Sequence, residues 1–230
     1  MVDHTVGHLQ QAAVRQLLDQ TLTQTMERLG AHIGAIWLVE PDGEVLSPEV
    51  GSGVPPQWIK PVLRIRLTTA IPDPRVEAVR ERRLVWIGSS EEYARRYPQT
   101  LLLIPYPHAV AFAPLVTEAA VWGVLLLAWP HGRPTELNRA EREAIGAAGD
   151  RLARLIEGAG EAGHRLLPSP EARYLPRIRR DPVGPAGASA AVGFVSRLPE
   201  GGCALTSDGR ITFIDRTAAD LVGESIPHLL

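Results

Sequence analysis

Apolar side chains recur at the spacing of one helix face close to the N-terminus, and polar side chains fill most of the positions between them. The apolar positions are Val14, Leu18, Leu22, Met26 and Leu29. Gly30 follows directly, and glycine is the residue that most often ends a helix. The pattern predicts one long amphipathic helix over residues 8–29.

Strand patterns come next in the chain. Residues 33–39 form a β-rich run, Pro41-Asp42-Gly43 has the chemistry of a turn, and residues 44–50 would return as the second strand of a hairpin. Residues 62–68 alternate leucine or isoleucine with arginine or threonine. This alternation predicts a strand with one buried face.

Four short elements and three longer ones are predicted in the rest of the N-terminal part. The short ones are a helix from Val54 that carries Trp58, a helix from Pro74 to Arg83, a strand over residues 84–87 and a helix over residues 89–97. Two strongly apolar runs, residues 108–115 and 120–129, predict the central strands of a sheet. A last long helix is predicted over residues 136–157, with Thr135 or Asn138 as its N-cap.

Charge and composition narrow the function classes. The chain carries 24 basic and 26 acidic residues, which gives no electrostatic footprint for nucleic acid. Its longest apolar stretch, residues 119–129, is too short to cross a bilayer, so we expect no membrane partner. Cys203 is the single cysteine, which excludes an internal disulfide and favours a reducing, cytoplasmic location.

The two central strands carry a family signature. It consists of Ala111-Phe112-Ala113-Pro114-Leu115, a turn, and Val121-Trp122-Gly123-Val124-Leu125-Leu126-Leu127. Together with the order of the elements, it resembles the GAF domain, a small-molecule sensor module, over residues 9–157. The resemblance implies an α+β fold with a central antiparallel sheet of five to six strands. It places long N- and C-terminal helices on one face and short helices over the other, and we assign residues 1–158 to this domain.

The C-terminal part differs in character. Residues 160–185 contain five prolines and five arginines without apolar periodicity, so residues 159–192 are interpreted as a linker. Residues 193–230, with strands over 202–205 and 210–214 and a short helix after them, are similar to the opening of a PAS domain. Because a whole PAS domain is longer, we expect a fragment of a larger bacterial signalling protein. The resemblance to GAF–PAS proteins implies that its output domain is a metal-dependent serine/threonine phosphatase of the sporulation type or a histidine kinase.

The GAF resemblance implies a ligand pocket between the sheet and residues 55–108. Aromatic and imidazole side chains in this segment could stack on a planar ligand and orient it through their polar groups. The candidates are Trp58, Trp86, Tyr93, Tyr97, Tyr106 and His108. The alternative interpretation is ordinary core packing. His108 and His32 lie on different predicted strands, so no metal site is expected, and the position of Cys203 argues against a covalently attached bilin.

The two long helices offer a possible interface. GAF resemblance implies that such helices lie side by side and often form a parallel homodimer. The candidate seam comprises Leu18, Leu22, Met26, Leu29, Leu152 and Leu155. The alternative is that this stripe covers the sheet of its own domain, because the two helical periods cannot be separated over so few turns.

These observations favour a sensory and regulatory function. We expect the chain to bind an unknown small molecule and to relay the signal through the C-terminal helix to an output domain in cis. The alternative is a degenerate GAF domain that binds nothing small and acts as a dimerisation scaffold. An enzyme is not expected, because the methionine-sulfoxide reductases of this fold use several cysteines and no other catalytic constellation is visible.

Overall fold

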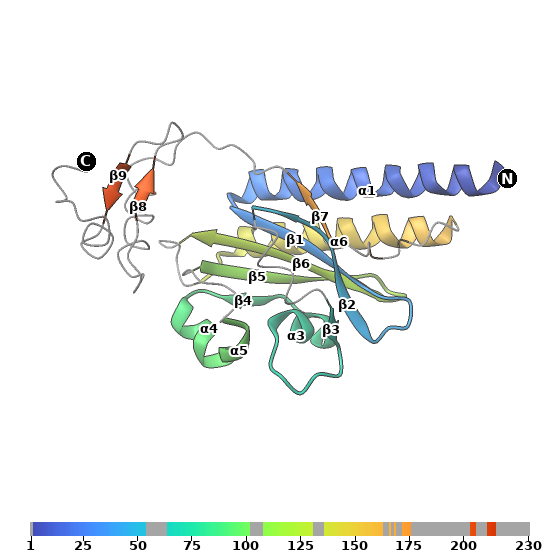
Figure 1. Ribbon diagram of the computed structural model, residues 1–230. Helices are drawn as coiled ribbons and strands as arrows, with labels where there is room; N and C mark the ends of the chain where they lie inside the picture. The colour runs from blue at the N-terminus through green and yellow to red at the C-terminus, as the bar shows by residue number, and fades with distance from the viewer. Residues whose placement is uncertain are drawn as a thin grey trace. The chain divides into compact units, whose positions relative to one another are not determined.

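The chain forms two compact units, residues 1–178 and residues 179–230. The computed structural model describes residues 2–53, 64–101, 108–130, 136–162, 166, 168, 172–175, 203–205 and 211–214 (Figure 1). The boundary at residue 158 between a first domain and a linker stays a prediction.

An antiparallel sheet whose strands differ in length forms the middle of the first unit. Its strands are β1 (Ile33–Val39), β2 (Val45–Ser52), β3 (Ile65–Arg66), β4 (Val85–Ile87), β5 (His108–Val116) and β6 (Val121–Pro130). They are hydrogen-bonded in the order β3-β2-β1-β6-β5-β4, and each of these pairs is antiparallel. The predicted α+β fold with its antiparallel sheet is confirmed.

Residues 62 and 63 of the strand expected over residues 62–68 lie outside the described residues. From residue 64 onward, Ile65 and Arg66 alone pair with β2 as strand, and the chain then turns at Leu67 and Thr68, so the strand ends two residues earlier than predicted. The turn continues because the Thr69 hydroxyl accepts a hydrogen bond from the backbone N–H of Ile71 at 3.1 Å. Side-chain bonds of this kind favour turns over extended strands. The chain is thereby directed toward the next helix.

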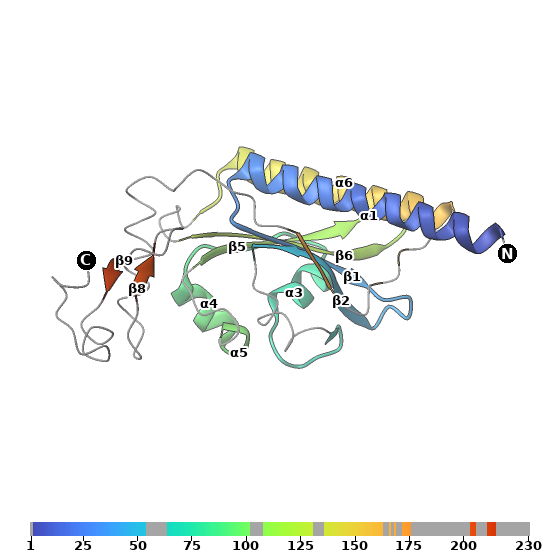
Figure 2. The same ribbon diagram turned by 45° about the horizontal axis from the view of Figure 1, so that its top comes forward.

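Two long helices cover one face of the sheet (Figure 2). They are α1 (Val2–Leu29) and α6 (Arg139–Glu161). Helix α6 begins with a capping box, because Asn138 Oδ1 accepts from the Glu141 N–H at 2.9 Å and Glu141 Oε2 accepts from the Asn138 N–H at 3.1 Å. Asn138 is therefore the N-cap of the two candidates. Apolar side chains of both helices share one core with the facing side of the sheet.

Within the described residues, three short helices cover the opposite face (Figure 2). They are α3 (Pro74–Glu81), α4 (Ser90–Arg96) and α5 (Pro98–Leu101), of which α5 was not predicted. Their apolar side chains form a second core with the other side of the sheet, including Trp37, Val79 and Phe112. The predicted arrangement of long helices on one face and short ones on the other is confirmed.

Glycine permits close packing at the centre of the sheet. A Cβ atom on Gly123 of β6 would lie 2.0 Å from the backbone oxygen of Trp37 in the neighbouring strand β1. A Cβ on Gly34 would lie 2.4 Å from Met26 Sδ of helix α1. The strands and the first helix can approach this closely only because these positions lack a side chain.

A further strand lies in the predicted linker. Strand β7 (Arg173–Leu175) pairs in parallel with β2, with Val50 opposite Arg173 and Ser52 opposite Leu175. Arg173 reaches Asp19 Oδ2 of α1 at 2.6 Å and Glu49 Oε1 of β2 at 3.0 Å. Part of the segment interpreted as a linker is therefore attached to the first unit.

Glu49 is the buried acid of this attachment. Its side chain has no exposed surface, and its Oε1 also lies 2.9 Å from Arg15 Nε of α1. A buried carboxylate needs such partners, because desolvation of an unpaired charge is costly. We call Glu49, Arg15, Arg173 and Asp19 the Glu49 cluster. It joins α1, β2 and β7.

The second unit contains one described hairpin. Strand β8 (Cys203–Leu205) pairs antiparallel with β9 (Ile211–Ile214), with Cys203 opposite Ile214. Both strands were predicted at nearly these positions. The turn between them and the short helix expected after them lie outside the described residues, and the PAS assignment stays a prediction.

We expect Gly123→Ala to destabilise the first unit by about 3 kcal/mol or more, because its methyl group would push two central strands apart. The matched control is Gly146→Ala in α6, where a Cβ would meet nothing within 4 Å. That change should stabilise the protein by up to about 1 kcal/mol through helix propensity. Urea unfolding measures both. Equal stability of the two variants would contradict the packing described.

We expect Arg173→Met to cost about 2 to 4 kcal/mol, because the buried Glu49 carboxylate loses one of its two arginine partners. Amide exchange of residues 173–175 should also become faster. Arg139→Met is the control, since Arg139 pairs with Glu143 at an exposed position where such a pair contributes little. A stability loss no greater than that of the control would show that the Glu49 cluster does not hold β7.

Candidate functional site

The structure separates the predicted aromatic residues between two faces of the sheet. Tyr93 and Tyr97 of the α4 region are buried against the short-helix face, and their rings make an edge-to-face contact with centroids 5.7 Å apart. Trp86 of β4 instead packs against the core of the long helices, with its ring 5.7 Å from that of Trp129. Successive strand residues point to opposite faces, which is why Trp86 departs from the predicted group. Trp86 therefore lies on the opposite face of the sheet from Tyr93 and Tyr97, and its part in a pocket stays a prediction.

Three other predicted pocket residues cannot be placed. Trp58 and Tyr106 lie outside the described residues. His108 is the first residue of β5, and only its backbone is described. Their part in a pocket stays a prediction.

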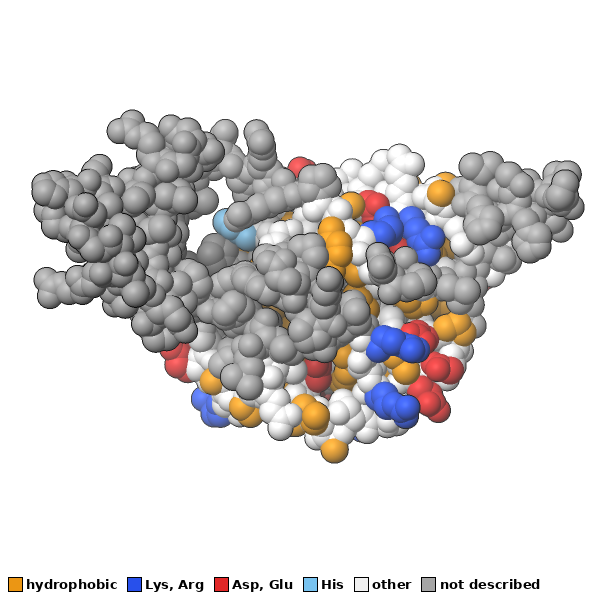
Figure 3. Space-filling view, viewed as in Figure 1, with side chains coloured by type: hydrophobic (Ala, Val, Ile, Leu, Met, Phe, Trp, Pro, Cys, Tyr) orange, Lys and Arg blue, Asp and Glu red, His pale blue; other side chains and the backbone are white. Residues whose placement is uncertain are grey.

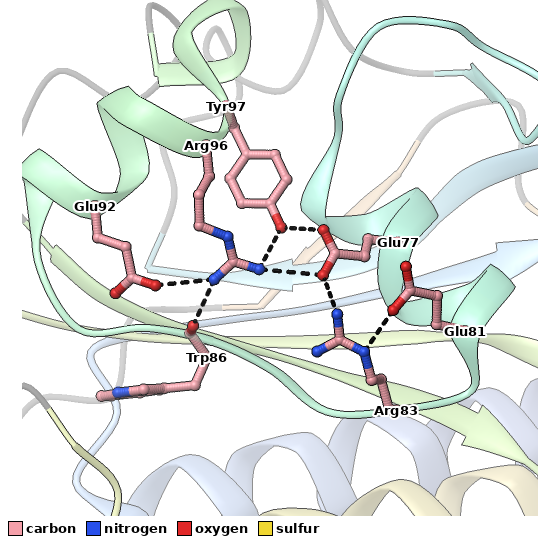
Figure 4. A network of polar contacts seen from close by, with 7 residues as sticks. All are labelled: Glu77, Glu81, Arg83, Trp86, Glu92, Arg96 and Tyr97. Carbon is pink, nitrogen blue, oxygen red and sulfur yellow. Dashed lines mark hydrogen bonds and ion pairs between the residues drawn. The ribbon is translucent and has the colours of Figure 1, made fainter.

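A polar network joins the short helices (Figure 4). The Tyr97 hydroxyl donates a hydrogen bond to Glu77 Oε2 of α3, and Arg96 of α4 donates to Glu77 Oε1 at 3.1 Å. Arg83 donates to the same Oε1 at 2.6 Å. Arg96 Nη1 also donates to Glu92 at 2.9 Å. One carboxylate therefore fixes α3 to the end of α4.

Arg96 ties this network to the sheet as well. Its Nη1 donates to the backbone oxygen of Trp86 in β4 at 3.2 Å, while the Trp86 ring points away from the network (Figure 4). Its guanidinium carbon lies 5.0 Å from the centre of the Tyr97 ring. Cation–π contact and charged hydrogen bonds together hold the short helices on the sheet.

A buried arginine lies at the start of α3. Arg75 donates from Nε to Asp73 Oδ1 at 3.0 Å and from Nη2 to Asp73 Oδ2 at 2.6 Å, and both side chains are less than one-tenth exposed. Asp73 Oδ1 also caps the helix by accepting from the Arg75 backbone N–H at 2.8 Å. The Arg75 guanidinium carbon lies 5.3 Å from the centre of the Trp37 ring. The fork of Arg75 is thus held in one orientation.

Two cavities open beside these groups. The first, about 530 Å³, is called the Arg75 pocket and is lined by Arg64, Ile65, Arg66, Thr68, Thr69, Ile71, Asp73, Arg75, Gln99 and Thr100. The second, about 460 Å³, is called the Tyr97 pocket and is lined by Thr69, Ala70, Ile71, Pro72, Asp73, Val76, Glu77, Arg80, Glu81 and Tyr97. Both volumes lie in the range of small-molecule sites. Thr69, Ile71 and Asp73 line both.

Burial perturbs the two tyrosines. Burial raises the pKa of Tyr93 to about 12, with the nearby charge of Arg75 acting in the opposite direction. Burial, followed by the hydrogen bond to Glu77, raises the pKa of Tyr97 above its ordinary value. The single O–H of Tyr97 already donates to Glu77, so this phenol is not free to donate to a ligand.

Most residues of the candidate dimer seam are buried inside the first unit, against the sheet. Leu18, Leu22, Met26 and Leu152 are at most 1 % exposed and belong to the core between the long helices and the sheet. Leu29 and Leu155 are partly buried against the same core. The alternative interpretation, in which the stripe covers its own sheet, is favoured by this burial.

Charged side chains of opposite sign lie close together on the surface. Arg64 Nε donates to Glu40 Oε1 at 2.9 Å, and Figure 3 shows further acidic and basic side chains next to one another on the described part of this face. Among the described residues, no group of three or more His, Cys, Asp or Glu side chains could hold a metal ion. Within the same part of the chain, none of the helices combines the length and apolar character needed to cross a membrane.

The residues around Arg75 and Glu77 were not predicted from the sequence. Asp73 directly precedes the proline that begins α3, which is the position of an N-cap, and this signal was available. Arg75 of α3 contacts Trp37 of β1, and Glu77 of α3 contacts Arg96 of α4. The local pattern of apolar and polar residues does not predict these contacts between separate elements. They depend on how α3 and α4 pack against the sheet.

Comparisons with known proteins agree with this architecture. A family model described as "GAF domain" matches residues 11–157. The chain is similar to the GAF domain/HD domain protein from Geobacter sulfurreducens, with 16 % identity, a TM-score of 0.51, and coverage of 64 % of this chain and 94 % of that chain. A search of curated proteins found no match.

Two further solved structures share the fold. One is the GAF domain of a phosphoenolpyruvate-protein phosphotransferase from Coxiella burnetii, with 13 % identity, a TM-score of 0.52, and coverage of 65 % of this chain and 86 % of that chain. The other is the type II free methionine-R-sulfoxide reductase from Thermoplasma acidophilum, with 12 % identity, a TM-score of 0.51, and coverage of 72 % and 99 %. At these identities the likeness concerns the fold alone.

The tyrosine environment predicts alkaline destabilisation. The ordinary pKa of 10.0 for tyrosine applies to the unfolded chain, and Tyr93 in the folded chain has a pKa of about 12. Between these values the unfolded state loses a proton that the folded state keeps, so stability is full below pH 10 and falls as the pH rises toward 12. The slope from Tyr93 alone approaches about 1.4 kcal/mol per pH unit. Urea unfolding at stepped pH should show a shallower loss for Tyr93→Phe, and an unchanged slope would contradict the assignment.

Proposed function

This chain belongs to the GAF domain family, and on that premise we propose that it is a sensory module of a cytoplasmic bacterial signalling protein that binds a small molecule beside α3. GAF domains are commonly sensory or regulatory modules in signalling proteins. The observation that carries the proposal is the pair of cavities of about 530 and 460 Å³ that meet at Thr69, Ile71 and Asp73. Polar groups fixed in orientation surround them, as ligand recognition requires.

Strand β2 connects the Arg75 pocket to the segment that follows α6. At one end of β2, Val45 pairs with Arg66 of the pocket wall. Toward the other end, Val50 pairs with Arg173 of β7. A ligand that shifts β3 would therefore act on the strand that holds β7. We propose that the signal leaves the domain through α6 and β7 toward an output domain in cis.

A regulatory function is favoured over an enzymatic one. The free methionine-R-sulfoxide reductase shares the fold, yet this chain has one cysteine, Cys203, which belongs to the second compact unit. A thiol reductase mechanism that exchanges disulfides needs more than one cysteine within reach. The proposal is therefore a binding module.

The alternative, a scaffold that dimerises without a ligand, receives less support. Leu18, Leu22 and Leu152 have no exposed surface to offer a second copy, because the sheet already covers them. A homodimer would have to use other side chains of α1 and α6. The cavities beside α3 would then have no assigned purpose.

Thermal and chemical unfolding in the presence of candidate ligands tests the proposal. Nucleotides, haem, aromatic metabolites and small organic acids are the compounds to screen. A ligand of the folded state at about one hundred times its Kd should stabilise the protein by about 2.7 kcal/mol. Ile71→Trp should abolish this effect, because Ile71 lines both cavities and an indole there would obstruct the part of each cavity beside it.

Leu17→Trp on α1 is the matched control. Leu17 is 45 % exposed and Ile71 is 49 % exposed, so the two substitutions add the same side chain at similarly open positions. Ligand stabilisation that disappears in Ile71→Trp and persists in Leu17→Trp supports the site. The absence of any stabilising compound, or stabilisation that survives Ile71→Trp, would contradict it.

A further inference from the structure

Arg75 has hydrogen-bonding capacity that the protein does not use. Its Nε and Nη2 donate to Asp73, and among the described residues Nη1 has no hydrogen-bond acceptor. Arginine offers five N–H donors, so the two N–H groups of Nη1 can each donate to a further acceptor. Because Arg75 lines the Arg75 pocket, these donors are placed where an occupant could accept from them.

The indole N–H of Trp37, whose ring lies under the Arg75 guanidinium, is a second donor without an acceptor among the described residues. Trp37 is 4 % exposed, and its Nε1 is buried without a hydrogen-bond partner in the described part of the chain. The Arg75 guanidinium lies over this ring, so the indole and the guanidinium belong to one buried cluster. Buried polar groups in native proteins are nearly always paired, and such exceptions point to an unrecorded partner. Both unused groups are donors, which requires an acceptor as that partner.

The charge of the pocket has a definite sign. Arg64, Arg66 and Arg75 line it together with one acid, Asp73. Asp73 neutralises Arg75, and Glu40 neutralises Arg64 at 2.9 Å. Arg66 is exposed and has no ion-pair partner among the described residues. One positive charge therefore remains at this pocket, although the whole chain has a net charge of −2.

We infer that the Arg75 pocket binds a small oxyanion, a compound that carries a carboxylate or a phosphate monoester, with its oxygens on the free edge of Arg75 and its charge balanced by Arg66. This inference rests on the proposed sensory function and names the class of its ligand. The planar fork of arginine matches the paired oxygens of both groups. Thr68, Thr69 and Thr100 supply hydroxyls for the rest of the molecule.

Pairs of probes with similar shape and different charge test whether the pocket recognises the charge of its ligand. We would titrate the full chain with benzoate against benzamide and with glycerol 3-phosphate against glycerol, by calorimetry at low salt. The anion of at least one pair should bind with a Kd lower by about tenfold than its neutral counterpart. Binding by benzoate alone identifies a carboxylate ligand, and binding by glycerol 3-phosphate alone identifies a phosphate ester. In either case the indole N–H signal of Trp37, assigned with Trp37→Phe, should shift.

Three variants locate the binding. Arg75→Lys keeps the charge and removes the fork, so anion affinity should fall by about tenfold. Because Arg75 is buried, its substitution also lowers stability. Arg66→Gln provides an independent test at an exposed position, with an expected loss of about threefold in affinity that shrinks at high salt. Arg142→Gln on the exposed side of α6 is the control with the same charge change and should bind as the unaltered chain does.

The outcomes separate this inference from the proposed function. Equal affinity for an anion and its neutral counterpart, or equal affinity in Arg66→Gln and Arg142→Gln, overturns the oxyanion assignment. If a neutral compound from the wider screen stabilises the protein and Ile71→Trp abolishes that effect, the sensory function stands without it. If no compound of either kind binds, both fail.

Discussion

The structure depends on one constraint, which is that the central strands are apolar on both faces. In β1, Ile36 and Leu38 face the long helices, and Ala35 and Trp37 face the short ones. An antiparallel sheet with one such side in water would expose a large apolar surface, so the chain must supply a layer on each side. The long helices provide the first layer as a continuous stripe. Glycines at the contact points bring these layers into direct contact, as at Gly34 beneath Met26.

The second layer is different in kind because its helices are short. An eight-residue, a seven-residue and a four-residue helix cannot be stable alone, and their buried apolar surface is small. Charged hydrogen bonds complete the attachment, with Glu77 joining α3 to α4 and Arg96 joining α4 to β4. A layer assembled from short pieces leaves gaps between them. The cavities that carry the proposed function are these gaps, and the segment between β3 and α3 forms their shared wall.

Strand β2 connects the Arg75 pocket with β7, the segment that follows α6. Strand β2 lies next to β1 in the sheet, and it bonds to β3 at one end and to β7 toward the other. The Glu49 cluster places a buried carboxylate at the junction with β7 and balances it with two arginines. Ion pairs of this kind contribute little net stability yet are costly to break, which makes them suited to specifying one docked arrangement.

Hydrophobic periodicity in the sequence determined the two long helices, the central strands and the hairpin of the second unit, because these elements bury continuous apolar faces. The stripe of Leu18, Leu22 and Met26 was visible in the sequence. Only the tertiary structure decided that it covers its own sheet, since a stripe does not specify what it packs against. Side chains alternate between the two faces of a strand, and Trp86 of β4 therefore lies on the face opposite Tyr93. Strand β3 ends at Arg66 because the next residues form a turn. The approach of Arg75 to Trp37 and of Glu77 to Arg96 joins residues from different elements, and no local pattern encodes such distances.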